Sequence, residues 1–209
     1  MLDFDTARML LGLPALVVAI VCHEYAHAQV ATWLGDDTPA MQGRLSLNPL
    51  VHLDLLGAIA LFLVGFGWAK PVQINIGAFR HRKRDEILVA LAGPLANLIM
   101  AFIATAILVI GSQVFGHHFD RAWFTMLQLM VMYNIGFAIF NLLPIPPLDG
   151  STIITAFLPW NLRMRLRNLT WVSLIVLLVI ANTPILTLIF RPVQRWILLL
   201  FSHIIGFFI

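Results

Sequence analysis

Two histidines and a glutamate stand close together near the amino terminus, in the run His23-Glu24-Tyr25-Ala26-His27. On a helix, residues four apart lie on one face, so the ring nitrogens of His23 and His27 can reach the same metal ion. Glu24, one position along, would lie beside that ion rather than bind it. A helix with this spacing supplies two zinc ligands and a general base. The five residues therefore predict zinc-dependent hydrolysis.

A catalytic zinc site usually has three protein ligands and a water, so a third ligand must come from another part of the chain. Asp149 is the best candidate, because three closely spaced prolines precede it and cannot continue a helix. An unwound backbone of this kind suits a water-fed site inside a membrane. Asp54 is a rival without such an approach, and a plain loop aspartate is the alternative interpretation of Asp149. We expect one zinc ion per chain, bound by His23, His27 and Asp149.

The composition places these residues in a membrane protein. Of 209 residues, 60% are hydrophobic and only 11% are charged, whereas soluble domains have about 25% charged residues. A charged group deep in an apolar span costs roughly 2.5–3.5 kcal/mol, so ionisable residues there imply a use. A soluble zinc protease is excluded. The net charge of +3 is modest and the basic residues cluster in a few loops, so we expect a lipid bilayer as partner and no nucleic acid.

Apolar runs divide the chain into membrane segments. Residues 10–34, 87–110 and 122–143 are each long enough to span a bilayer. The shorter run 53–68 is interrupted by glycines, which favours a re-entrant or interfacial segment. The C-terminal part, 169–209, forms either one long span with a surface helix or two spans broken near the Asn-Thr-Pro sequence at its middle.

The fold class expected is therefore an all-α polytopic membrane protein, with about five or six membrane segments around a three-helix catalytic core. We expect a single domain, 1–209, with its catalytic core at about 10–150 and its C-terminal membrane helices at about 168–209. Two stretches, 43–48 and 70–76, alternate polar and apolar residues as short β-strands do. A small interfacial β-sheet is expected from them.

Such a sheet offers a way to hold a substrate. A helical substrate must unwind before its peptide bonds can be attacked, and a sheet edge can bind the unwound segment as an added strand. The candidate clamp consists of residues 72–76 and of five residues from the first stretch, namely Arg44, Leu45, Ser46, Leu47 and Asn48. A sheet with only a structural role is the alternative. His52 and Asp54 follow this stretch. Gating the site or bracing a ligand is one interpretation of both, and a loop role is the simpler one.

Three motifs taken together resemble the site-2 protease family. They are the HEYAH run described above, the run Ala-Gly-Pro-Leu-Ala-Asn at 92–97, and the run Asn-Leu-Leu-Pro-Ile-Pro-Pro-Leu-Asp-Gly at 141–150. Members of this family are intramembrane zinc metalloproteases, and the resemblance covers about residues 10–150. The chain is similar to the compact members, which carry no PDZ-like or CBS domain.

The resemblance implies roles for individual residues. His23, His27 and Asp149 would bind the zinc ion, and Glu24 would be the catalytic acid/base. Asn141 falls on the family's asparagine near the active site, where its amide would assist in stabilising the oxyanion. The implied reaction is hydrolysis of peptide bonds within or near the transmembrane segments of single-span membrane proteins. The implied location is the plasma membrane of a prokaryote.

Two further asparagines lie in the apolar spans. Asn97 is a candidate for contacting substrate or for bracing the histidine helix, and Asn134 is interpreted as structural. Asparagines also join membrane helices by hydrogen bonds without any catalytic role, and this alternative remains open for both residues and for Asn141.

The zinc ligands also constrain topology, because they must meet at one depth. His27 lies toward the C-terminal side of its span and Asp149 at the C-terminal end of its span, so both ends must face the same side. They do so only if the run 53–68 does not cross. The basic residues between 44 and 84, with the arginines at 163–167, then share that side. The positive-inside rule makes it cytoplasmic.

Other interpretations remain. Buried histidine and carboxylate groups also build ion or proton pathways, so a membrane transporter is an alternative, and a non-catalytic zinc-binding membrane protein is another. The presence of Glu24 argues against the latter. Cys22 is interpreted as a small buried apolar residue, and His117 and His118 as solvated loop residues rather than metal ligands.

Overall fold

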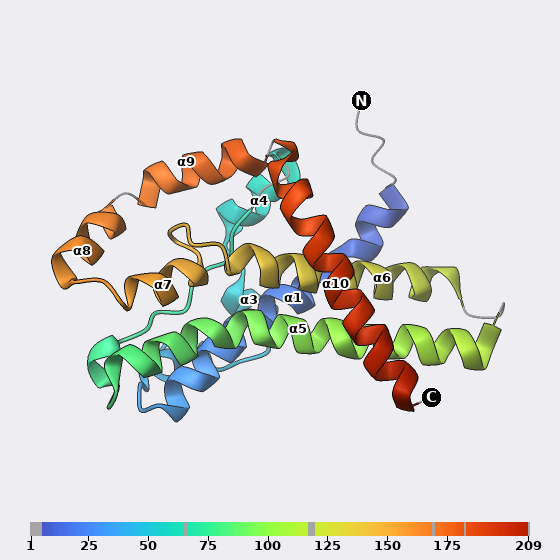
Figure 1. Ribbon diagram of the computed structural model, residues 1–209, viewed down its shortest axis with the longest axis horizontal. Helices are drawn as coiled ribbons and strands as arrows, with labels where there is room; N and C mark the ends of the chain where they lie inside the picture. The colour runs from blue at the N-terminus through green and yellow to red at the C-terminus, as the bar shows by residue number, and fades with distance from the viewer. Residues whose placement is uncertain (1–5, 65–66, 117–119, 169, 182, 209) are drawn as a thin grey trace.

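The computed structural model describes residues 6–64, 67–116, 120–168, 170–181 and 183–208, and this part of the chain is helical in most of its length (Figure 1). The two histidines at 117 and 118 lie outside the described residues. The elements are, in chain order, α1 (Thr6–Trp33), α2 (Thr38–Met41), α3 (Pro49–His52), α4 (Leu55–Val64), the 3-10 helix η1 (Ile76–Ala78), α5 (Arg82–Phe115), α6 (Arg121–Asn141), α7 (Asp149–Thr155), α8 (Trp160–Asn168), α9 (Thr170–Ala181) and α10 (Pro184–Phe208).

Three long helices, α1, α5 and α6, pack side by side and form the expected three-helix core (Figure 1). Small residues line their contacts and let the backbones approach closely, as in other membrane helix bundles. The alanines buried in this way are Ala15, Ala19, Ala28, Ala31, Ala101, Ala104 and Ala138. Helix α10 crosses over α5 and α6 in Figure 1, and its Phe201 packs edge-on against Phe102 of α5.

The outer surface of the bundle is apolar, as a bilayer requires. On α5 one stripe of large exposed side chains faces outward, formed by Leu95, Ile99, Ile103, Ile107 and Ile110. Four described helices are long and apolar enough to cross a membrane: α1, α5, α6 and α10. The chain is thus an integral membrane protein.

Two shorter helices cannot cross a bilayer by themselves. Helix α4 has 10 residues and α9 has 12, so at 1.5 Å per residue they reach about 15 and 18 Å. A hydrocarbon core is about 30 Å thick. Of the two arrangements left open for the C-terminal region, the structure has the break near the Asn-Thr-Pro sequence, because α9 ends at Ala181 and α10 begins at Pro184. Only α10 of these two helices is long enough to span.

The expected interfacial sheet is not formed by the described residues. Their single β contact is an isolated bridge between Leu53 and Ala69. Next to this bridge Lys70 N donates to the carbonyl of His52, and beyond it side chains rather than a second strand bind backbone groups of the segment up to residue 75. The guanidinium of buried Arg44 donates to the carbonyls of Lys70 and Pro71, while carboxylates accept from backbone N–H groups on this segment. The segment is extended because it spans between these side chains, not because it pairs.

Candidate metal centre and cavity

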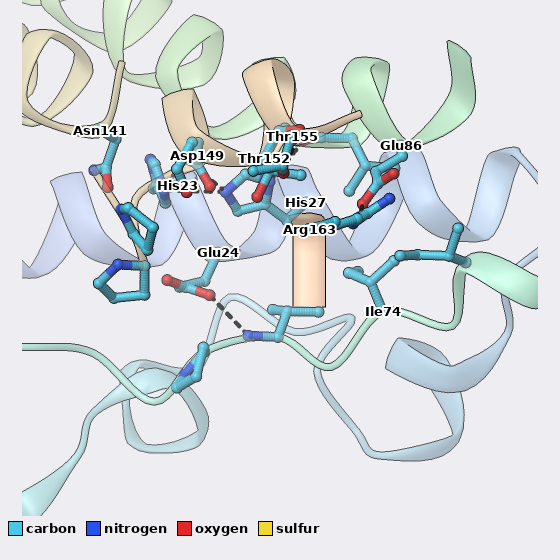
Figure 2. A pocket seen from close by; sticks show the side chains of 18 of the residues that line it. His23, Glu24, His27, Ile74, Glu86, Asn141, Asp149, Thr152, Thr155 and Arg163 are labelled. Carbon is cyan, nitrogen blue, oxygen red and sulfur yellow. Dashed lines mark hydrogen bonds and ion pairs between the residues drawn. The ribbon is translucent and has the colours of Figure 1, made fainter. Parts of the chain in front are cut away.

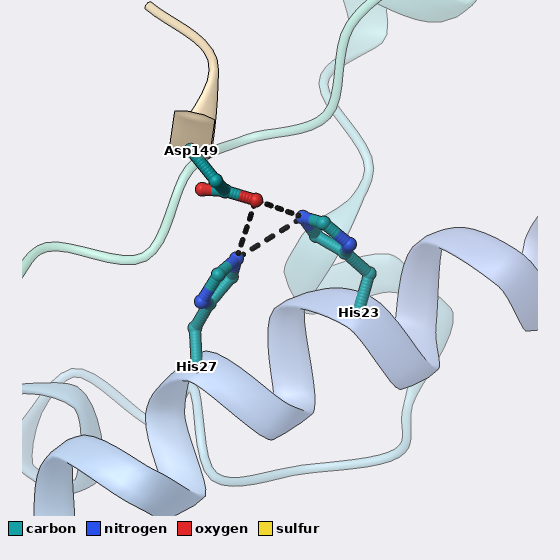
Figure 3. A group of neighbouring side chains, drawn as sticks. All are labelled: His23, His27 and Asp149. Carbon is teal, nitrogen blue, oxygen red and sulfur yellow. Dashed lines mark hydrogen bonds and ion pairs between the residues drawn. The ribbon is translucent and has the colours of Figure 1, made fainter. Parts of the chain in front are cut away.

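Three side chains converge at one end of the helical core. His23 Nε2 and His27 Nε2 lie 3.0 Å apart on α1. Asp149 Oδ2, at the start of α7, lies 3.2 Å from the first and 3.3 Å from the second (Figure 3). Both histidines are buried. The spacing of four residues on α1 therefore places the two rings as predicted, and the third residue is Asp149. The rival Asp54 is not in this group, because its carboxylate accepts from Gly57 N at the start of α4.

The approach of Asp149 depends on the turn that precedes it. Helix α6 ends at Asn141, and the proline-rich segment 142–148 carries the chain back toward α1 without forming a helix. Gly150 permits this reversal, since a Cβ there would lie 2.2 Å from the carbonyl oxygen of Leu142. The prolines and the glycine together place the carboxylate opposite the two imidazoles.

The atoms that face one another are suited to a cation. His27 Nδ1 lies 2.7 Å from the carbonyl oxygen of Val89, which only accepts, so Nδ1 carries a proton and Nε2 is the ring nitrogen left to bind a metal ion. Asp149 Oδ2 is buried and has no hydrogen-bond donor among the described residues. Burial alone would raise the pKa of Asp149, but the adjacent His27 and His23 hold it below its usual value. The carboxylate is therefore ionised, the form that binds metal.

The group opens into a cavity of about 450 Å³ (Figure 2). Glu24 lies in its wall, and Glu24 Oε2 accepts a hydrogen bond of 3.1 Å from the backbone N–H of Val72. The extended segment forms one side through Pro71, Val72, Ile74 and Ile76. The opposite side comes from α5, α7 and α8, with Glu86, Val89, Thr152, Thr155 and Arg163 among its residues. A metal-binding group, a carboxylate and an extended backbone thus share one cavity.

Comparison with known proteins agrees with this geometry. The family model of "Peptidase family M50" matches residues 11–181. The chain belongs to peptidase family M50. The M50 chain is 40% identical over 90% of its length to the Bacillus subtilis protein named "Putative zinc metalloprotease YwhC", and it covers 90% of that protein.

Two less similar relatives align with most of the length of this chain. The Mycolicibacterium smegmatis protein named "Putative zinc metalloprotease Rip2" is 28% identical. The match covers 92% of this chain and 77% of the relative. Stage IV sporulation protein FB of Bacillus subtilis is 28% identical over 86% of the chain and 62% of its own length. No solved structure matches. The chain is thus a zinc metalloprotease of a membrane-protein family, as the resemblance to site-2 proteases implies.

The other candidate residues of this M50 chain lie in different surroundings. Asn141 lines the cavity, and its Nδ2 donates to the carbonyl of Phe137. Asn97 is fully buried, and its Oδ1 lies 2.8 Å from His23 Nδ1, which supports a bracing role rather than substrate contact. Cys22 is half-buried and stands outside the metal-binding group.

The first half of the expected clamp is placed differently. None of the five residues from Arg44 to Asn48 lines the cavity. Arg44 turns inward to bind carbonyls, the Ser46 carbonyl lies 2.7 Å from Nε2 of buried His52, and Asn48 caps α3 through Leu50 N. These contacts make the 44–52 region a support for the extended segment. His52 belongs to this support as the buried last residue of α3, not as a loop residue.

No role at the M50 site was predicted from the sequence for three residues that the structure places there. Glu86 and Arg163, which line the same side of the cavity, form a side-chain ion pair, and a Cβ at Gly93 of α5 would overlap both imidazole rings. Arg163 had a signal only as part of a basic cluster. Glu86 stands at the start of an apolar run, which is a weak signal for a functional carboxylate. The requirement for glycine at position 93 becomes visible only when α5 is packed against α1.

Proposed function

We propose that this M50 chain is an intramembrane protease that cleaves within or near the transmembrane segments of single-span membrane proteins. In this proposal His23, His27 and Asp149 bind one zinc ion, and Glu24 is the catalytic acid/base. The supporting observation is that these four side chains line a single cavity at one end of apolar, membrane-length helices. A soluble peptide would not need its protease to be built in this way.

Each residue has a distinct role in the proposed reaction. Zinc, when bound, supplies a Lewis acid and lowers the pKa of a bound water. Glu24 takes the proton of the attacking water and passes it to the leaving nitrogen. The hydrogen bond from Val72 N to Oε2 holds the Glu24 carboxylate beside the metal-binding group. Asn141, in the cavity wall, would donate to the developing oxyanion the amide hydrogen that the Phe137 carbonyl does not accept.

The proposed substrate clamp is the segment 72–76. It is extended, it lies along one wall of the cavity, and between 70 and 75 it is not paired with another strand in the described part of the chain. A locally unwound substrate bound as an added strand would have its peptide bonds beside Glu24. Two side chains hold the backbone within and just before this segment: Asp36 accepts from Asn75 N, and Arg44 donates to the carbonyl of Lys70.

We further propose that the cavity faces the cytoplasm of a prokaryotic cell and that α4 belongs to a re-entrant segment. Helix α4 is too short to cross, so α1 and α5 run in opposite directions and the zinc end carries the basic residues that precede and begin α5. The positive-inside rule assigns such an end to the cytoplasm. A reporter fused near Arg82 that is active only outside the cytoplasm would overturn this orientation.

One experiment tests the proposed chemistry. The full chain is purified in detergent, its bound zinc is measured, and cleavage of a model single-span substrate is followed for the wild type and Glu24→Gln. We expect Glu24→Gln to keep zinc and lose cleavage, because the amide cannot accept the water proton. Equal cleavage by the two proteins contradicts the catalytic role of Glu24. Zinc retained by His27→Ala combined with Asp149→Ala contradicts the ligand set.

A further inference from the structure

A buried chain of hydrogen bonds connects α6 to the metal-binding group. Asn134 Oδ1 on α6 lies 2.9 Å from Asn97 Nδ2 on α5. Asn97 Oδ1 in turn lies 2.8 Å from His23 Nδ1 on α1. Both asparagines have no solvent exposure. Three helices are thus joined by two amide side chains that end on the ring of His23.

The direction of every bond in this chain is determined by backbone carbonyls, which only accept. Asn134 Nδ2 donates to Met130 O at 2.8 Å, so Asn134 must turn its oxygen toward α5. Asn97 Nδ2 donates both to that oxygen and to Ala19 O at 2.9 Å, so Asn97 must turn its own oxygen toward His23. An acceptor at this position requires the ring proton of His23 on Nδ1. The Nε2 atom, which faces Asp149, is then the ring nitrogen left to bind the metal ion.

We propose that Asn134 is a positioning residue of the zinc site, acting through Asn97 to hold His23 in the tautomer and ring orientation that bind metal. The proposal rests on the role of His23 as a zinc ligand. It extends the site to a residue two helical turns before Asn141 that does not line the cavity. Partners of this kind fix the tautomer of metal-bound histidines and tune affinity for the ion.

The two histidines are held by different groups, which explains why only one of them needs the chain of hydrogen bonds through the two asparagines. His27 Nδ1 bonds directly to the Val89 carbonyl of α5. His23 lies one turn earlier on α1 and reaches α5 only through the side chain of Asn97. A side-chain amide can rotate and exchange its oxygen and nitrogen, whereas a helix carbonyl cannot. The Ala19 carbonyl opposes this rotation, and Asn134 adds the second bond that opposes it.

The test compares two substitutions at one position in the full chain purified in detergent. Asn134→Leu removes the acceptor facing Asn97, while Asn134→Asp retains an oxygen there. Zinc affinity is measured by competition with a chelator, and the melting temperature of the metal-free protein is measured separately. We expect Asn134→Leu to weaken zinc binding about tenfold and Asn134→Asp to stay within about threefold of the wild type. Asn134→Ser, whose short side chain does not reach Asn97, should behave like Asn134→Leu and replaces it if that variant does not fold.

Two controls separate positioning from general loss of stability. Thr105→Val removes a buried hydroxyl of α5 whose one hydrogen bond within the described part of the chain goes to Ala101 O of the same helix, and we expect it to leave zinc affinity unchanged. Asn97→Leu should weaken zinc binding at least as much as Asn134→Leu, and combining the two should add nothing further, because both act through one bond to His23.

The outcomes that would overturn the proposal are distinct. Unchanged zinc affinity in Asn134→Leu or Asn134→Ser, with only the melting temperature lowered, makes Asn134 merely structural. Full additivity in the double variant overturns the shared route. His23→Ala is included as a third arm. If His23→Ala binds zinc as well as the wild type, the ligand assignment itself fails, whereas a loss of zinc there with unaffected Asn134 variants rejects this inference alone.

Discussion

Gly93 of α5 lies directly against the imidazole of His27. A Cβ at Gly93 would lie 2.4 Å from His27 Nε2 and 2.6 Å from His23 Cε1. These distances are shorter than any contact that carbon and nitrogen atoms tolerate, and neither ring can withdraw, because each is bound through its Nδ1 atom. Because Gly93 has no side chain, α5 can pack against the rings of both His23 and His27.

Substitution of Gly93 should therefore damage the metal site more than the fold. We expect Gly93→Ala to weaken zinc binding at least tenfold, because the methyl group occupies space needed by the rings. Gly136→Ala on α6 is the matched control, since its Cβ would meet only Gln194 Nε2 at 3.9 Å. Bound zinc is measured after purification of both variants. Full zinc occupancy in Gly93→Ala would show that the rings move aside without loss.

The bond from Val72 to Glu24 predicts a defect in chemistry without a defect in metal binding. Val72→Pro removes the N–H that Glu24 Oε2 accepts, and hydrogen bonds to charged groups contribute about 1.5–3 kcal/mol. We expect kcat on a model substrate to fall about 10- to 100-fold while bound zinc stays constant. Val72→Ala keeps the N–H and is the control. If both variants lose activity equally, the side chain matters and the N–H does not.

The sequence predicted the metal site because the rules involved are local. The pair His23 and His27 needs only the helical repeat, and Asp149 needs only the prolines that stop α6. The lengths of the apolar runs likewise predicted the three core spans, and the Asn-Thr-Pro sequence offered the break before Pro184 as one of two alternatives. These features depend on neighbours within one or two helical turns, so they can be inferred without knowledge of packing.

Features that depend on distant residues were missed or misjudged. The alternation at 70–76 predicted a paired strand, but Glu24, Asp36 and Arg44 bind that backbone instead. A residue pattern describes which side chains alternate, and it does not say what occupies the backbone groups. The pair of Glu86 and Arg163 joins residues 77 apart, and nothing local in the sequence associates them.

Asp36 should control the position of the extended segment. It is almost fully buried, and its two oxygens accept from Asn75 N at 2.7 Å and from Thr38 N at 3.0 Å. Asp36→Ala leaves two backbone donors without this partner, at a cost of about 1–3 kcal/mol each. We expect KM for a membrane substrate to rise several-fold as the segment shifts.

The neighbouring exposed Asp37 provides the control for this change, because its side chain makes no capping hydrogen bond to α2. Asp37→Ala should leave KM and the melting temperature unchanged. Bound zinc should be equal in both variants, since neither carboxylate belongs to the metal-binding group. A loss of zinc in Asp36→Ala would mean that the segment supports the metal site as well as the cavity wall.

The ion pair between Glu86 and Arg163 should behave as a buried pair. The Glu86 side chain is 6% exposed and that of Arg163 is 21% exposed, so removal of one partner leaves a poorly solvated charge. Loss of one partner of a buried pair costs about 3–5 kcal/mol, and the partial exposure of Arg163 lowers this to about 2–3 kcal/mol. We expect Glu86→Gln and Arg163→Gln each to lower the melting temperature, while the double variant regains part of the loss.

A double-mutant cycle distinguishes this pair from two independent residues. The melting temperatures of the wild type, both single variants and the double variant are measured in one detergent, with Arg165→Gln of the same helix as the exposed control. Simple addition of the two losses would contradict a direct pair. Because α8 follows the helix of Asp149 and α5 carries Val89, the pair joins two of the helices that form this side of the cavity. Its loss should therefore also reduce cleavage, with bound zinc retained.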